Sequence, residues 1–347
     1  MSSQAEFFES TSVQDKVFGA RPSSSVHRLR ERRLASSNGP LFYFISHDQL
    51  DFNCLVDTGS GDGGGDLRAF LEERFRAEFN EKELLLVNTH SHAEQVGNNH
   101  RFATGLNRLV TGVREICAGG ANREFTKELL GGSECGMTGA TIRRYIITQW
   151  LSDGDVVDLC SRRRALTRPD CRLHVIETPG HTPDSISLYY PREKLLFVGD
   201  FIYRWKPILV CGRASDLATY HRSAKVLLNF VQSLPEGPEI RLCCGHVDDY
   251  LDWRPSLEML LVLLKNIKAG RTRPLAPPQS LLALYKEEPL VQFETRDSSL
   301  TLVCKRSDPF IGSAPKSTSR ANSSGSLRTQ RTEPSCSYHS TAWNSAQ

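Results

Sequence analysis

The stretch Thr89-His90-Ser91-His92-Ala93-Glu94-Gln95 directly follows the apolar run LLLVN at residues 84–88. An apolar run of this length is typical of a strand buried on both faces of its sheet. In an extended segment the side chains of His90 and His92 point to the same side, so both imidazoles can reach one cation. A single His-X-His motif is weak support for a metal site, and its weight depends on the rest of the chain.

Three later residues stand in comparable settings. His181 lies in the sequence TPGHT, Asp200 ends the sequence FVGD, and His246 ends the sequence CGH. Each follows a glycine near the end of a predicted strand, where the backbone can turn without a Cβ clash. Together with Glu94, these side chains predict a metal-binding cluster built from strand ends.

The elements predicted around these motifs indicate the fold class. Apolar and aromatic runs predict strands over residues 41–46, 52–57, 84–88, 173–178, 185–190, 195–199 and 240–244, and a hairpin over 290–294 and 300–304. Helical spacing predicts helices over about 66–79, 216–233 and 256–269, and the glycine-rich section 105–144 is expected to form loops around a cleft. Two sets of strands with helices outside them, without regular βαβ alternation, favour an α/β fold: an αββα sandwich of two mixed β-sheets flanked by helices.

Composition limits the domain organisation and the class of partner. The 347 residues are 39% hydrophobic and 24% charged, values ordinary for a folded, water-soluble protein. We predict a poorly ordered segment over residues 1–39, the sandwich domain over 40–306 and a disordered Ser/Arg-rich tail over 307–347. The formal charge of +3 is carried by residues 313–347. The remainder is neutral and offers no electrostatic footprint for nucleic acid or anionic lipid.

The termini and the apolar runs suggest a location in the cell. The longest uninterrupted aliphatic run, residues 259–264, is far shorter than the roughly 20 residues that a bilayer requires. The first residues have neither the basic start nor the apolar core of a secretory signal. We therefore expect a cytoplasmic protein without a membrane span.

Five motifs occur along the chain in an order typical of one family, namely VDTG (56–59), THSHAEQ (89–95), PGHT (179–182), LFVGD (196–200) and CCGH (243–246). On these motifs the chain resembles the metallo-β-lactamase superfamily from about residue 41 to 269. The resemblance implies an αββα fold with the metal site at one edge of the two sheets, and it implies that Asp57 supports the metal loops through hydrogen bonds. The ligands it implies are His90, His92 and His181 on a first metal, Asp200 between two metals, and His246 on the second.

Two positions depart from the family motif HxHxDH, because Glu94 stands where aspartate is expected and Gln95 where histidine is expected. The Gln95 carbonyl is a poorer zinc ligand than imidazole, so we place Gln95 beside the ligands. Three hypotheses stay open. In the first, one Zn²⁺ holds a water of pKa about 7 that Glu94 orients or deprotonates. In the second, Glu94, Asp200 and His246 form a weaker, oxygen-rich second site for iron or manganese. In the third, the site has decayed and binds metal or a partner without turnover.

The resemblance also narrows the reaction. We expect a hydrolase in which zinc-bound hydroxide attacks an acyl carbonyl of a small molecule, most plausibly a thioester or related ester, with Glu94 and Asp200 as catalytic carboxylates. Residues 178–203 resemble the branch that contains acyl-CoA hydrolases, whereas glyoxalase II-type enzymes match in part. Nuclease members carry an extra domain between the motifs of Asp200 and His246, but here 45 residues separate them, so no nucleic-acid substrate is expected.

Three residues near the motifs have simpler expectations. Tyr203 and Trp205 follow Asp200 closely enough to line the cleft, where they either contact substrate or pack at the surface. His100 lies five positions past Gln95, which on a helix turns it about 140° away. We therefore expect a structural role for His100.

Overall fold

The structure is a computed structural model that describes residues 18–20, 25–31, 39–61, 66–102, 112–131, 142–285 and 288–312. Residues 313–347, which hold most of the predicted tail, lie outside the described residues, as does most of the predicted lead-in.

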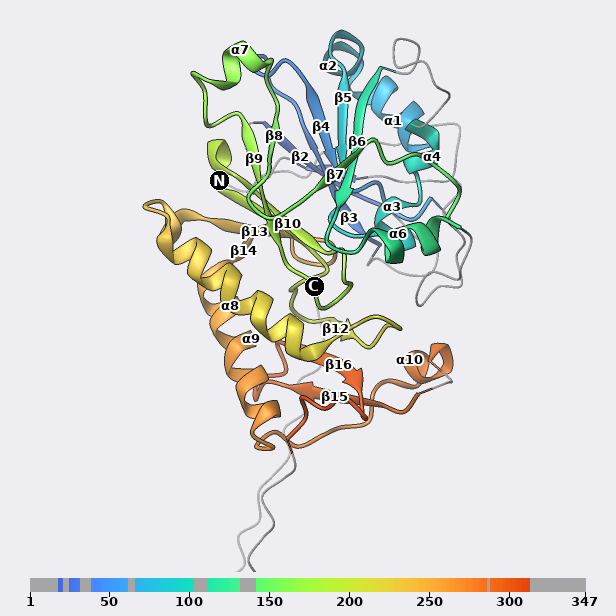
Figure 1. Cartoon of the computed structure of the whole chain (residues 1–347), viewed down its shortest axis with the longest axis vertical. Coiled ribbons are helices and arrows are strands. Elements are labelled where there is room, and N and C mark those ends of the chain that lie inside the picture. The colour runs from blue at the N-terminus through green and yellow to red at the C-terminus, as the bar shows by residue number, and fades with distance from the viewer. Residues whose placement is uncertain are drawn as a thin grey trace, which may run out of the picture. The chain divides into compact units, whose positions relative to one another are not determined.

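Among the described residues, the first sheet has seven strands (Figure 1). In spatial order they are β1 (Phe18–Ala20), β2 (Val26–Arg30), β3 (Leu41–Ile45), β4 (Asn53–Val56), β5 (Leu84–Val87), β6 (Val113–Gly119) and β7 (Gln149–Leu151). The first four strands pair antiparallel, and β4 to β7 pair parallel. The sheet is therefore mixed, as predicted.

The second sheet has six strands in the part of the chain that the structure describes. In spatial order they are β14 (Leu251–Asp252), β13 (Arg241–Cys244), β11 (Leu195–Gly199), β10 (Ile186–Tyr190), β9 (Arg172–Glu177) and β8 (Val156–Asp158). Only β11 and β13 pair parallel in this sheet. A smaller sheet follows, with the described strands in the order β12 (Pro207–Val210), β16 (Thr301–Lys305) and β15 (Leu290–Glu294). The predicted hairpin is the antiparallel pair β15 and β16.

The described helices cover the sheets or connect their strands. They are α1 (Leu67–Arg74), α2 (Arg76–Glu81), α3 (Ala93–Val96), α4 (Asn99–Phe102), α6 (Arg123–Leu130), α7 (Arg162–Ala165), α8 (Leu217–Ser233), α9 (Trp253–Lys268) and α10 (Gln279–Leu284), with short 3-10 turns at Pro191–Glu193 and Gly237–Glu239. In Figure 1, α8 and α9 run side by side. None of these described helices combines the length and apolar character needed to cross a membrane.

The alternation of side chains along the strands creates three apolar layers. On β3, Tyr43 belongs to the cluster that joins the two sheets, and Phe42 and Phe44 belong to the cluster under α1. On the second sheet, Leu188 faces the first sheet, whereas Tyr189 packs in the cluster that contains α8 and α9. This alternation, with period two, gives each sheet one face toward the other sheet and one toward helices. The predicted αββα sandwich is confirmed.

Three details differ from the predictions. Strands β1 and β2 lie within residues 1–39, so the predicted poorly ordered lead-in is wrong for that part. Within the section 105–144, predicted as loops, β6 and α6 are regular elements. The helix predicted over 66–79 is interrupted at Phe75, whose φ of −119° and ψ of 38° end α1.

Candidate metal centre

The predicted ligands lie where strands of both sheets end. His90 and His92 follow β5 in the first sheet, and His181 follows β9 in the second sheet. Asp200 directly follows β11, and His246 follows the neighbouring parallel strand β13. Residues from four separate stretches of the chain thus meet at one edge of the sandwich.

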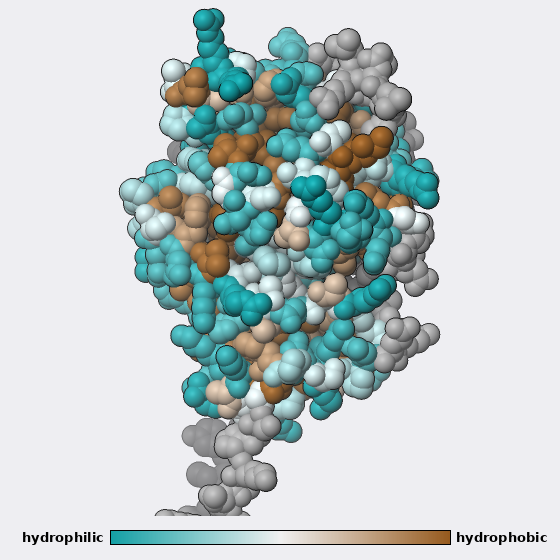
Figure 2. Space-filling view, in the orientation of Figure 1, coloured by the Kyte–Doolittle hydropathy of each residue, from teal (hydrophilic) through white to brown (hydrophobic). Residues whose placement is uncertain are grey.

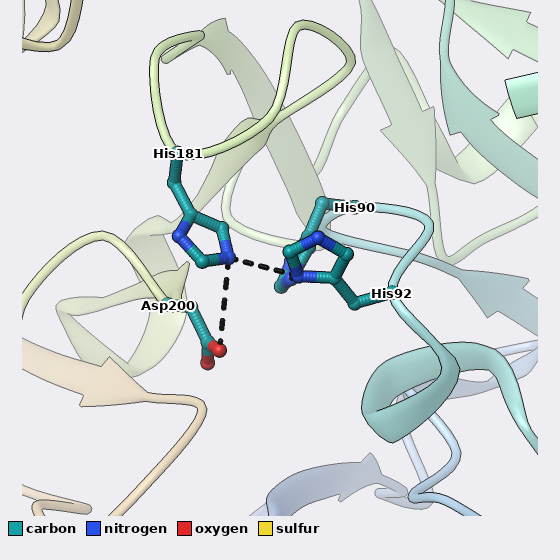
Figure 3. Close-up of side chains that lie close together, drawn as sticks. All are labelled: His90, His92, His181 and Asp200. Atoms are coloured by element: carbon teal, nitrogen blue, oxygen red, sulfur yellow. Dashed lines mark hydrogen bonds and ion pairs between the residues drawn. The ribbon is translucent and has the colours of Figure 1, made fainter. Parts of the chain in front are cut away.

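Three histidines form the first group, which we call the imidazole trio: His90, His92 and His181. Their rings point toward one another (Figure 3), with His90 Nε2 3.2 Å from His92 Nδ1 and His181 Nε2 3.0 Å from the same His92 atom. One ligand atom from each, together with a carboxylate oxygen of Asp200, all lie within 4.8 Å of one another. Nitrogen ligands about 2.0–2.1 Å from a tetrahedral zinc ion stand about 3.3 Å apart, so the trio fits a zinc-sized cation.

Burial opposes protonation of two members of the trio, and a backbone contact orients the third. Burial, and then the neighbouring imidazoles, lowers the pKa of His92 to about 3 and holds that of His90 well below its usual value. His181 Nδ1 lies 2.7 Å from the carbonyl oxygen of Leu209, which can only accept a hydrogen bond, so Nδ1 carries a proton and Nε2 faces His92. Neutral imidazole is the form that binds a metal.

Asp57 anchors the loop that carries the first two histidines. Its Oδ1 accepts a hydrogen bond from the Thr89 backbone N–H at 2.8 Å, and its Oδ2 accepts one from the Thr89 hydroxyl at 2.7 Å. The Thr89 hydroxyl oxygen lies 3.2 Å from His90 Nδ1. Burial raises the pKa of Asp57 to about 8, against the effect of these hydrogen bonds. Asp57 therefore contacts Thr89, which in turn contacts the candidate ligand His90, and this is the kind of contact that the resemblance implies.

Glu94, Asp200 and His246 form the second group, which we call the carboxylate group. His246 Nε2 lies 3.1 Å from Glu94 Oε2 and 3.4 Å from Asp200 Oδ2. Burial alone would lower the pKa of His246, but the charge of Asp200 and hydrogen bonds to both carboxylates raise it. Burial would raise the pKa of Glu94, but the hydrogen bond and charge of His246 hold it at about 2. The two carboxylates therefore favour the protonated form of His246.

Gln95 lies against the carboxylate group rather than apart from it. Its side-chain Nε2 donates to Asp200 Oδ1 at 3.2 Å, and the side chain is buried. Its Oε1 has no hydrogen-bond partner within the described residues, and the same holds for His246 Nδ1. The Gln95 amide N–H thus uses Asp200 Oδ1 as its hydrogen-bond acceptor.

Two glycines let the ligand loops approach each other. At Gly245 a Cβ would lie 2.3 Å from Asp200 Oδ1, and at Gly199, where φ is +52°, it would lie 2.5 Å from the Thr89 hydroxyl oxygen. Real Cβ contacts are not this short, so only glycine fits either position. Backbone at these two positions forms the inner wall of the site.

The remaining predicted residues lie at different distances from the ligands. The buried Tyr203 ring stands 5.5 Å, centroid to centroid, from the His246 ring, in an edge-on contact. Trp205 is 66% exposed with a φ of 63°, and its backbone N–H donates to the Ser299 carbonyl. His100 Nδ1 lies 2.9 Å from the Gly97 carbonyl oxygen, and His100 is in neither ligand group.

A cavity of about 400 Å³ opens beside His92 and His181. Its walls are α6, which contributes Phe125 and Leu129, and the segment 212–215 between β12 and α8. No individual residue of this cavity other than the histidines is predicted from the sequence. The four-residue spacing of Phe125 and Leu129 is the signal that could have pointed to an apolar helix face.

Known proteins share the fold and several motifs. Residues 164–260 match the family model described as the metallo-beta-lactamase superfamily. A hydroxyacylglutathione hydrolase of Saccharophagus degradans is 29% identical over 192 residues, which are 55% of this chain and 54% of that protein. One of Bartonella tribocorum is 39% identical over 75 residues, 21% of this chain and 26% of that protein. The chain thus matches between about a quarter and about half of the length of these relatives.

Solved structures extend the likeness over more of the chain. A beta-lactamase domain protein from Burkholderia ambifaria has a TM-score of 0.53 and 16% identity, covering 83% of this chain and 95% of that chain. A metallo-beta-lactamase from Pontibacter korlensis has a TM-score of 0.51 and 18% identity, covering 72% of this chain and 100% of that chain. These structures confirm the predicted fold, and the family match covers residues 164–260 of the region in which the motifs occur.

Proposed function

We propose that this chain, which has the metallo-β-lactamase fold, is a metal-dependent hydrolase of acyl thioesters or related esters. The observation that carries the proposal is the convergence of three imidazoles, with nitrogens 3.0 and 3.2 Å apart, beside a cavity large enough for a small substrate. Three nitrogen ligands with a position left open toward substrate are typical of catalytic zinc sites.

His90, His92 and His181 would hold the metal, and Asp200 lies close enough to join them. A divalent ion at this position supplies a Lewis acid that polarises the acyl carbonyl and lowers the pKa of water. Tetrahedral nitrogen ligation favours zinc, whereas the oxygen-rich carboxylate group would suit iron or manganese if a second ion binds. The protein itself contributes the orientation, through the His181 contact with Leu209 and the Asp57 contacts with Thr89.

Glu94 is the side chain that we assign to orienting the attacking water. The hydrogen bond from His246 keeps its pKa at about 2, so Glu94 stays ionised and accepts hydrogen bonds rather than holding a proton for long. Asp200 and His246 keep the Glu94 carboxylate in place through the ion pair that the three residues share.

The substrate class rests on the curated relatives. The curated relatives are named as hydrolases of hydroxyacylglutathione, in which an acyl group is carried on a thiol. We carry over to this chain the hydrolysis of an acyl group from a thiol or alcohol, and not the identity of the carrier, because the match covers about half of those proteins or less.

The test is metal analysis of the purified protein paired with a panel of acyl thioesters and esters. We expect about one zinc ion per chain and hydrolysis of at least one thioester, both lost in His181→Ala. Bound metal without turnover of any member of the panel would favour a metal-binding scaffold instead. Bound iron or manganese in place of zinc would correct the proposed identity of the metal but would not contradict the proposed hydrolase activity.

A further inference from the structure

The cavity beside the imidazole trio has one wall that is a regular helix. Phe125 and Leu129 are four residues apart on α6, so they lie one above the other on the same helix face and both line the cavity. Leu129 is buried and Phe125 is partly buried, and both pack with the cluster under the first sheet. This wall is apolar and is fixed to the core.

Charged side chains lie at the rim of the same cavity. Glu124 and Glu128 form the neighbouring stripe of α6, and Arg213 of the opposite wall comes within 3.9 Å of Glu128. Both side chains of this pair are more than half exposed, so the pair is worth little in stability and can open for a substrate. The rim carries two acids and one base, which does not favour an acyl group that ends in a carboxylate.

A chain of buried hydroxyl groups ties α6 to both metal loops. The Ser91 hydroxyl, between His90 and His92, donates to Thr126 Oγ1 at 3.4 Å, and the Thr126 hydroxyl donates to Asp184 Oδ2 at 3.0 Å. Asp184 lies three residues after His181 and is fully buried, as is Thr126. These hydrogen bonds therefore fix α6, and with it the apolar wall, relative to the loop of His90 and His92 and to the loop of His181.

Resting on the proposed function, we propose that this cavity is the acyl-group subsite and that it takes an uncharged, straight-chain acyl group along Phe125 and Leu129. Thr126 and Asp184 are positioning residues that align the subsite with the metal centre. A volume of about 400 Å³ lies in the lower part of the range for small-molecule pockets, which suits an acyl chain rather than a whole carrier molecule.

The first test measures kcat/KM for N-acetylcysteamine thioesters with acyl chains of two, four, six and eight carbons. We expect an increase of about fourfold for each added methylene group until the cavity is filled. Phe125→Ala and Leu129→Ala should both flatten this dependence, and Lys127→Ala, on the same helix but outside the cavity lining, should leave it unchanged. A flat dependence in the wild type, or a slope in both cavity variants equal to that of the wild type, would overturn the subsite.

A binding measurement separates failure of the subsite from failure of the proposed function. Calorimetric titration of the zinc-loaded protein with octanoate and acetate requires no turnover. Tighter binding of octanoate, reduced in Phe125→Ala, supports the subsite even if no thioester in the panel is hydrolysed. Equal binding of both acids would count against the subsite even in an active hydrolase.

The second test concerns the hydroxyl chain. Thr126→Val keeps the shape of the side chain but removes the donor to Asp184, whereas Thr126→Ser keeps the hydroxyl. We expect Thr126→Val to raise the KM for the octanoyl thioester about tenfold, with kcat for the acetyl thioester and the metal content unchanged, and Thr126→Ser to restore it. Equal losses at every chain length, or loss of metal, would show a merely structural role.

Discussion

The imidazole trio and the carboxylate group lie side by side in the same site, yet their surroundings have opposite effects on the protonation of the histidines. In the trio, ring nitrogens face one another at 3.0 and 3.2 Å, and burial together with the neighbouring rings opposes protonation of His90 and His92. In the carboxylate group, the charge of Asp200 and the hydrogen bonds to both carboxylates raise the pKa of His246. One group thus opposes protonation of two of its imidazoles, whereas the other group favours protonation of its imidazole.

This difference bears on which of the two groups binds a cation more easily. Burial already opposes protonation of His90 and His92, so protons compete little for these nitrogens. A cation entering the carboxylate group competes with the protonated form of His246 and must break its contact with Glu94. Gln95 adds a donor toward Asp200 where a further ligand would be needed. We therefore expect the trio to bind metal more tightly than the carboxylate group.

The largest effect should follow from removing a member of the trio. His181→Ala leaves two imidazoles and opens the contact with the Leu209 carbonyl, so we expect loss of bound metal and a fall in metal affinity above about 100-fold, the upper range for losing a residue that only supports a ligand. Metal analysis after dialysis measures this. The matched control is His100→Ala, which removes a histidine outside both groups. Metal retained in His181→Ala would refute the trio as the main site.

A smaller effect is expected from the carboxylate group. Glu94→Gln keeps the size of the side chain but removes the charge that orients water, so turnover should fall by about 10² while metal content stays the same. Single-substrate kinetics with the best thioester, alongside metal analysis, separates the two quantities. Wild-type turnover would remove Glu94 from the mechanism, and loss of metal would make it a ligand instead.

The third effect tests whether the two groups can be made equal. Gln95→His replaces the amide that donates to Asp200 by an imidazole, so we expect metal content to rise from about one toward two per chain. Gln95→Asn, which keeps an amide but shortens it, is the control and should not add metal. An unchanged stoichiometry in Gln95→His would show that Gln95 is not what weakens the second position.

The smallest effect concerns pH in the metal-free protein. Because the folded pKa of His246 lies above its usual value of 6.5, its contribution to stability is complete below pH 6.5 and is lost as pH rises through the folded pKa. His90 and His92 have lowered pKa values, so their contribution is complete above pH 6.5 and is lost as pH falls through the folded values. Each slope is at most about 1.4 kcal/mol per pH unit for one proton.

Denaturant unfolding of the metal-free protein between pH 5 and 9 measures both slopes. His246→Asn should remove the loss of stability on the alkaline side and leave the acid side in place. If the alkaline slope persists in His246→Asn, the ion pair of the carboxylate group is not its cause. Bound zinc should reduce the acid-side slope only in a pH range where the trio keeps the ion.

Most of the elements that build the site are visible in the sequence. The helix predicted over 216–233 is observed as Leu217–Ser233, because Asp216 accepts a hydrogen bond from the Thr219 N–H at its start and the apolar spacing is regular. The candidate ligands are also visible, since His90, His92, His181, Asp200 and His246 each follow the end of a predicted strand. The structure brings all six of the predicted ligand side chains into the two groups.

What sequence reasoning missed depends on contacts between distant residues. β2 contains Arg28 and Arg30, which look unsuited to a sheet, but Arg28 pairs with Asp249 and Arg30 donates to the Val247 carbonyl at 3.1 Å. The cavity likewise joins α6 to a segment more than eighty residues later in the chain. Neither the arginine contacts nor the cavity walls leave a local sequence pattern, because the residues that meet are distant in the sequence and come together only when the chain has folded.

Gly199 and Gly245 have a consequence for how this centre can diverge. Exchange of one candidate ligand side chain leaves the backbone around the site in place. A methyl group at Gly199 would instead lie 2.5 Å from the Thr89 hydroxyl oxygen, in a loop of the other sheet, and one at Gly245 would lie 2.3 Å from Asp200 Oδ1, in a loop of the same sheet. The candidate ligands can therefore change while the fold is kept, whereas Gly199 and Gly245 cannot gain a side chain. A survey of variants should find that the fold tolerates substitutions of candidate ligands far more often than substitutions of residues 199 and 245.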